Sequence, residues 1–131
     1  MKSRDNLLRL KHFQVQDKTR QLAQIDMMIA EFERMSGDLV AQIEVEEKKA
    51  GITDVSHFAY PTFAKAARTR VDNLAVSIRD LQQKREPAEE ALKEAEEELR
   101  KAELKEARDG NSTEIADPVV DEMVERRMMI G

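Results

Sequence analysis

Apolar residues recur every seven positions along the first half of the chain, in two interleaved series. The first series is Leu8, Val15, Leu22, Ile29, Ser36 and Ile43, and the second is Lys11, Lys18, Ile25, Phe32, Leu39 and Glu46. The steps between them alternate between three and four residues, which is the spacing of coiled-coil seam positions. The pattern predicts one long helix over about residues 3–50.

The second half of the chain repeats this pattern. Its two series are Ala67, Leu74, Leu81, Ala88, Ala95 and Ala102, and Val71, Ile78, Arg85, Leu92, Leu99 and Glu106. They predict a second helix over about residues 61–109. Each helix would be about 70 Å long at 1.5 Å per residue, and helices of this length need a partner to bury the apolar stripe.

Glycine and proline mark the predicted boundaries. Gly51 would stop the first helix and Pro61 would start the second, so residues 51–60 form the predicted tip. Pro87 is expected to kink or break the second helix, because proline lacks the backbone N–H that continues it. Gly110 is expected to end that helix, and residues 110–131 are predicted to be a tail that forms a short helix or stays disordered.

Charge predicts that the two helices pair antiparallel. Residues 1–20 and 65–85 each carry a net charge of +4, whereas residues 31–50 and 90–109 each carry −3. Antiparallel pairing places opposite charges together, and flanking charges select the orientation of coiled-coil partners. The predicted fold class is therefore all-α, with two long helices forming an antiparallel coiled-coil hairpin in which Leu8 lies near Ala102 and Ile43 near Ala67.

Composition restricts the function. The 131 residues suit one domain, and the absence of cysteine excludes disulfides and thiolate chemistry. No apolar run is long enough for a membrane span and no signal peptide is recognisable, so we expect a cytoplasmic protein. The net charge of −5 and the scarcity of aromatic residues argue against nucleic-acid binding.

The sequence offers no recognisable catalytic or metal site. His12 and His57 are far apart and neither has a second ligand at metal spacing. The glutamate-rich segments are typical of solvated helix faces, and no phosphate-binding glycine loop is present. We therefore expect neither an enzyme nor a cofactor. Met27, Met28 and Met35 are interpreted as packing residues on or near the seam.

The predicted tip concentrates aromatic residues in a chain that has few. Phe58, Tyr60 and Phe63 fall where two helices turn and little core is available. Aromatic side chains at such a position can be interface anchors. They can equally fold inward and plug the end of the coiled coil, and the sequence leaves both interpretations open.

Four segments resemble the FliJ family of flagellar export proteins. They are Met1–Asp5, Leu10–Val15, Ala30–Met35 and His57–Arg68, the last containing the distinctive Tyr-Pro tip. The resemblance covers about residues 1–108. Family members usually continue a charged helix beyond this point, where the present chain has Gly110.

The resemblance implies a two-helix antiparallel coiled coil that acts as a stalk-like coupling factor of flagellar type III export. It implies three protein partners, namely the hexameric export ATPase, the cytoplasmic domain of the export gate and the export chaperones, and a location at the flagellar base. We expect the open end to contact the ATPase through Arg4, Leu7, Leu8, Arg9 and Lys11. We expect the tip to contact the gate through Phe58, Tyr60, Phe63 and Ala67.

Two alternatives remain at this level. The chain could be a chaperone, or a chaperone escort, for exported flagellar substrates. It could also be a structural coiled coil that only dimerises. The seam cannot separate these functions because all of them need it; the residues exposed at the tip and at the open end can, since a purely structural coiled coil has no need to expose aromatic side chains.

Overall fold

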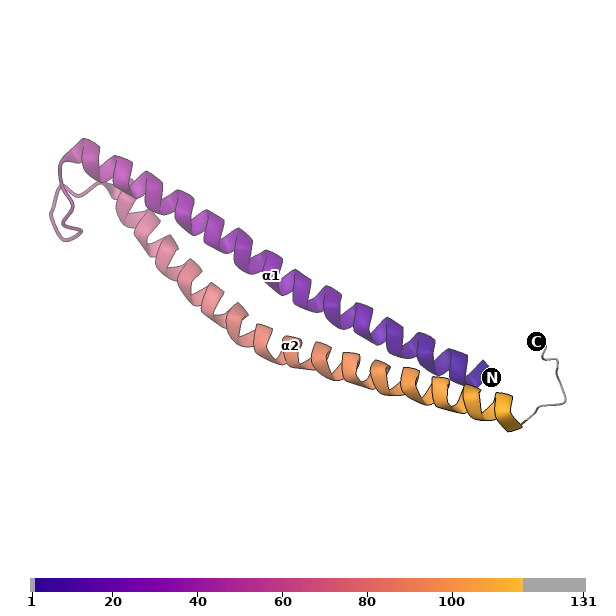
Figure 1. Cartoon of the computed structure of the whole chain (residues 1–131). Coiled ribbons are helices and arrows are strands. Elements are labelled where there is room, and N and C mark those ends of the chain that lie inside the picture. Colours follow the sequence, from indigo (N-terminus) through magenta and orange to yellow (C-terminus); the bar gives the residue numbers. More distant parts are fainter. Residues whose placement is uncertain (1, 117–131) are drawn as a thin grey trace. The chain divides into compact units, whose positions relative to one another are not determined.

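The computed structural model describes the backbone of residues 2–116 and the side chains of residues 3–110. It contains two helices, α1 over Lys2–Ala50 and α2 over Thr62–Ala116. They run antiparallel and are joined by residues 51–61 (Figure 1). The predicted all-α antiparallel coiled-coil hairpin is therefore confirmed. Residues 117–131, most of the predicted tail, lie outside the described part of the chain.

The helices form two compact units. The open-end unit pairs residues 2–18 of α1 with residues 92–116 of α2, and the tip unit comprises residues 19–91. Ion pairs join α1 and α2 within each unit. In the open-end unit, Lys11 Nζ lies 2.7 Å from Glu98 Oε1. In the tip unit, Arg85 Nε lies 2.5 Å from Asp26 Oδ1.

Burial follows the predicted seam. In both helices, every described residue of the two heptad series is buried or partly buried. The most deeply buried are Ile43, Ala67, Leu74, Leu81 and Ala95. Ile43 and Ala67 belong to one core cluster, as predicted. A seam with alanine on one side lets the helices approach closely and still excludes water from the larger side chains.

Gly51 ends α1 as predicted. Its φ of 69° lies in the left-handed region that glycine adopts without steric cost. The N–H groups of Gly51 and Ile52 both donate to the carbonyl oxygen of Glu47, at 2.8 and 3.3 Å. These two bonds satisfy a carbonyl that the end of the helix would otherwise leave unpaired.

Two positions that were predicted to interrupt the second helix lie inside α2. Pro87 lies inside α2, which continues through it without a break. Gly110 does not end α2 either, because the helix continues to Ala116. A single proline removes one helical hydrogen bond and a single glycine costs about 1 kcal/mol relative to alanine, so a long helix with a packed face can contain both.

Neither described helix contains a window that is both long and apolar enough to cross a lipid bilayer.

Candidate protein-binding surfaces

Three side chains form a hydrogen-bonded triad beneath the tip. Tyr60 donates its hydroxyl to Glu47 Oε2 at 2.6 Å, and Arg68 Nε donates to the same hydroxyl at 2.8 Å. An Arg68 terminal nitrogen also donates to Glu47 Oε2 at 2.6 Å. Tyr60 is 6% exposed and Glu47 8%. Each member of this tip triad, Glu47, Tyr60 and Arg68, therefore bonds to both of the others.

The tip triad keeps its carboxylate ionised. The hydrogen bond from Arg68, and then the one from Tyr60, hold the pKa of Glu47 below its usual value. The same contacts raise the pKa of Arg68. A buried carboxylate is costly unless it is paired and hydrogen-bonded, and here both conditions are met. The tip triad thus connects the last turns of α1 to the first turns of α2.

Tyr60 is therefore a plug and not part of an exposed surface. It packs in the core cluster with Ile43, Ala64 and Ala67. Ala67 is only 5% exposed. Tyr60 and Ala67 were predicted to contact the export gate, which requires exposed side chains, but both are buried. The heptad pattern could not reveal this, because Tyr60 lies outside the series and its partner Glu47 flanks the seam.

The connecting loop is held by its own hydrogen bonds. Asp54 Oδ1 accepts from the N–H of Ser56 at 3.0 Å and from its hydroxyl at 2.7 Å. The Asp54 carbonyl accepts from the N–H of His57 at 3.0 Å. His57 Nδ1 in turn accepts from the N–H of Ala59 at 3.0 Å. Side chains that bond to nearby backbone groups fix turns in this way.

Phe58 projects from this fixed loop into solvent. Its side chain is 96% exposed, although phenylalanine is among the residues most often buried. The imidazole of His57 stacks on it, with ring centroids 4.8 Å apart. The loop thus displays one aromatic ring in a defined position, which is the arrangement expected of an interface anchor.

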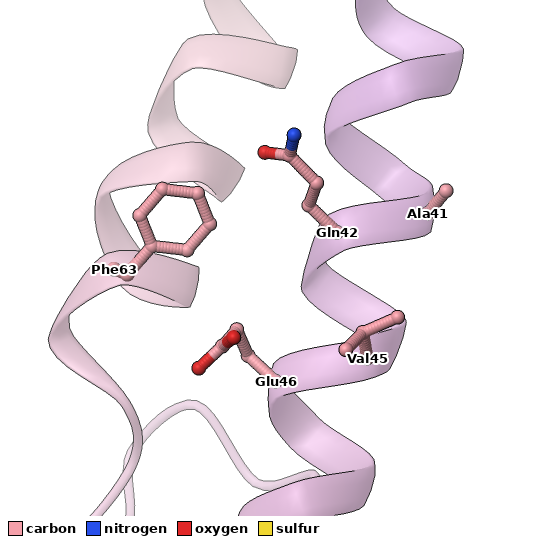
Figure 2. A pocket seen from close by; sticks show the side chains of 5 residues that line it. All are labelled: Ala41, Gln42, Val45, Glu46 and Phe63. Atoms are coloured by element: carbon pink, nitrogen blue, oxygen red, sulfur yellow. The ribbon is translucent and has the colours of Figure 1, made fainter.

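Phe63 lines an open groove between α1 and α2. Ala41, Gln42, Val45 and Glu46 of α1 complete its wall, and its volume is about 420 Å³. Figure 2 shows Phe63 of α2 facing Gln42 and Glu46 of α1. Phe63 and Val45 are each 52% exposed. Phe63 is thus neither a fully buried plug nor a fully displayed anchor.

The open-end residues predicted to bind a partner divide into two groups. Leu8 is partly buried in the seam, Lys11 is paired with Glu98, and Arg4 Nε lies 3.6 Å from Glu106 Oε1. These three side chains therefore contribute to the fold. Leu7, which is 44% exposed, and Arg9 face solvent.

Two exposed apolar residues in this region were missed. Leu10 is 50% exposed and Phe13 58%. With Leu7 they are spaced three residues apart along α1, so they share one helix face. The sequence could have indicated this exposure. Leu10 and Phe13 lie outside both heptad series, and apolar residues outside the series cannot all be buried in a two-helix seam.

The interpretation of the methionines is partly wrong. Met27 is 70% exposed and Met28 47%, so neither is a packing residue of the seam. Met35 is partly buried, in agreement with the interpretation. Met27 and Met28 precede the seam residue Ile29 in the sequence, so their side chains lie on other faces of α1 than the one that packs against α2.

Among the described side chains, those of residues 3–110, no group of three metal-ligating residues lies close enough to hold an ion. His12 Nε2 lies 3.6 Å from Glu103 Oε2 in the open-end unit, whereas His57 belongs to the loop of the tip unit. The two histidines thus lie in different units and have different contacts.

Comparisons of the chain with protein-family models, with curated proteins and with solved structures found no match.

Proposed function

We propose that this chain is a stalk-like coupling factor of flagellar type III protein export. In this proposal it is a non-enzymatic protein at the cytoplasmic base of the flagellum. It binds the hexameric export ATPase, the cytoplasmic domain of the export gate and the export chaperones. The proposal rests on the resemblance of its tip and α1 segments to the FliJ family, whose members are expected to have the antiparallel two-helix fold described above.

The observation that best supports the proposal is the display of Phe58. An aromatic side chain that is 96% exposed on a hydrogen-bonded loop contributes little to folding. Such a ring is suited to binding, because a fixed loop loses little conformational entropy when a partner covers it. The gate contact is accordingly assigned to Phe58 and Phe63, and Tyr60 and Ala67 support the loop from within.

The ATPase contact is assigned to the exposed part of the open end, Leu7 and Arg9 together with Leu10 and Phe13. Arg4 and Lys11 form ion pairs with α2, so they hold the register of this unit. A solvent-exposed arginine beside apolar side chains suits an acidic partner surface, because charge steers association and apolar burial supplies affinity.

Reconstitution with the purified flagellar export ATPase tests the proposal. The expected result is that the chain binds the ATPase and increases its rate of ATP hydrolysis, and that the gate domain binds the chain through Phe58. Phe58→Ala should weaken gate binding at least tenfold. Val76→Ala is the matched control, since Val76 is also exposed in the tip unit but lies on α2. Failure of the unmodified chain to bind either protein would contradict the proposal.

A second function is favoured by a different observation. Met27 and Met28 form an exposed, flexible apolar pair on α1. Methionine-rich surfaces adapt to varied partners, which suits a chaperone or chaperone escort for exported flagellar proteins. Replacing both with glutamine would weaken binding to an export chaperone in that case and would leave stimulation of the ATPase unchanged.

A further inference from the structure

The tip unit carries both a projecting aromatic ring and an open, partly apolar groove. Phe58 projects from the loop and is 96% exposed, so it does not enter the groove of its own chain. The groove has a volume of about 420 Å³ and is lined by Ala41, Gln42, Val45, Glu46 and Phe63. Gln42 and Glu46 are the side chains of α1 that face Phe63 (Figure 2). Both features are exposed on the same unit, and exposed apolar groups of this kind are typical of interaction sites.

We propose that the groove of Ala41, Val45 and Phe63 receives Phe58 from a second copy of this chain. The contact associates two molecules through their tip units. It goes beyond the proposed export function, because it needs no other protein.

The polar groups around the two features match as well. His57 Nδ1 accepts a hydrogen bond from the N–H of Ala59, so the neutral imidazole carries its proton on Nε2. An N–H donor therefore accompanies the Phe58 ring on which His57 stacks. The groove lining supplies acceptors, the carboxylate of Glu46 and the amide oxygen of Gln42. An aromatic ring with a donor beside it thus meets a groove whose lining combines apolar side chains with acceptors.

Charge does not oppose the contact. Residues 51–61 contain one charged side chain, Asp54, and its carboxylate accepts two hydrogen bonds from Ser56. Glu46 in the groove lining lies 3.9 Å from Lys49, which offsets part of its charge. An almost uncharged loop can approach this groove without the like-charge repulsion that excludes wrong partners.

The area involved predicts weak association. A phenylalanine side chain buries about 150–250 Å², whereas stable interfaces bury roughly 1,200–2,000 Å² in total. Even two reciprocal contacts remain below that range. The expected dissociation constant is on the order of 1 mM, so the contact forms where the chain is concentrated and yields to a partner that binds Phe58 more tightly.

Because the chain contains no cysteine, pairs of single-cysteine variants can test the contact without background. Ala59→Cys places a thiol beside Phe58 and retains the ring, and Ala41→Cys places one in the groove. A mixture of these two chains, treated with a short thiol-specific crosslinker, is expected to give at least fivefold more mixed dimer than Ala59→Cys with Val76→Cys. Val76 is 48% exposed on α2 and serves as the positional control.

Adding Phe58→Ala to the Ala59→Cys chain should reduce the yield with Ala41→Cys at least fivefold. The helical circular dichroism should not change, since Phe58 is almost fully exposed. Equal yields with and without Phe58, or equal yields at positions 41 and 76, would overturn the proposal and leave the groove to a different occupant.

Sedimentation equilibrium of the unmodified chain gives an independent result. The average mass should rise above that of one chain as its concentration approaches the millimolar range, and Phe58→Ala should remove that rise. Identical behaviour of the two proteins would also overturn the proposal.

Discussion

The tip triad predicts that two neighbouring aromatic residues respond in opposite ways to truncation. Tyr60 is 6% exposed and its hydroxyl bonds to Glu47 and Arg68, whereas Phe58 is 96% exposed. We therefore expect Tyr60→Phe and Tyr60→Ala to destabilise the fold and Phe58→Ala to leave it almost unchanged. The sequence alone left open whether each of these side chains is an interface anchor or a plug.

The magnitude follows from the contacts. Hydrogen bonds to charged groups contribute about 1.5–3 kcal/mol. Glu47 and Arg68 still bond to each other at 2.6 Å when the hydroxyl is gone, so Tyr60→Phe should cost about 1.5–2 kcal/mol. Tyr60→Ala also removes the buried ring beside Ile43 and Ala64 and should cost about 3–5 kcal/mol. Phe58→Ala should change the free energy of unfolding by less than about 0.5 kcal/mol.

Urea unfolding followed by helical circular dichroism measures these differences. In thermal unfolding, a decrease of 1 kcal/mol in the free energy of unfolding corresponds to a decrease of about 4 °C in the melting temperature of a chain of this size. The three variants should therefore rank in the order Phe58→Ala, Tyr60→Phe and Tyr60→Ala. If Tyr60→Phe were as stable as the unmodified protein, the tip triad would not stabilise the fold. If Phe58→Ala were as damaging as Tyr60→Ala, the loop would not display Phe58.

Three other predictions concern charge and register. Hydrogen bonds lower the pKa of Glu47 in the folded protein, so the stabilising contribution of its carboxylate should be complete above about pH 4.5 and be lost as the pH falls below that value. In urea unfolding measured across this pH range, the stability of Glu47→Gln should depend less on acid than that of the unmodified protein. An unchanged dependence would contradict the assignment. Arg9→Glu should reduce stimulation of the export ATPase without loss of helicity. Lys11→Glu should also lower the urea midpoint of unfolding, because it breaks the ion pair with Glu98. Equal urea midpoints for the two variants would refute that distinction. A Leu8→Cys, Ala102→Cys double variant should form an intramolecular disulfide on oxidation, seen as faster migration in a non-reducing gel, and its absence would argue against the register of the open-end unit.

The sequence determined the fold class, the antiparallel orientation, the seam and the end of α1. Each depends on a regularity that extends along the chain. The heptad spacing of residues such as Ile43 and Ala67 specifies a seam because a helix repeats every 3.6 residues, and the charge blocks favour antiparallel pairing wherever they meet. Gly51 could be identified because only glycine adopts a left-handed cap without strain.

Local interruptions were harder to predict, because tertiary packing competes with them. Pro87 and Gly110 are unfavourable in isolated helices, yet α2 contains both. Much of the stability of a long helix comes from the face that it packs, and the cost of one residue is small beside that contribution. A propensity assigned to one position therefore cannot decide where such a helix ends.

Only the tertiary structure decided which tip residues are buried and which are displayed. Phe58 and Tyr60 are two residues apart and chemically similar, and nothing in their spacing distinguishes them. The distinction arises because Glu47 and Arg68, 13 and 8 residues away from Tyr60, meet its hydroxyl in space. A turn has no repeating period from which the direction of a side chain can be read, so its direction is fixed by partners that only the folded chain brings together.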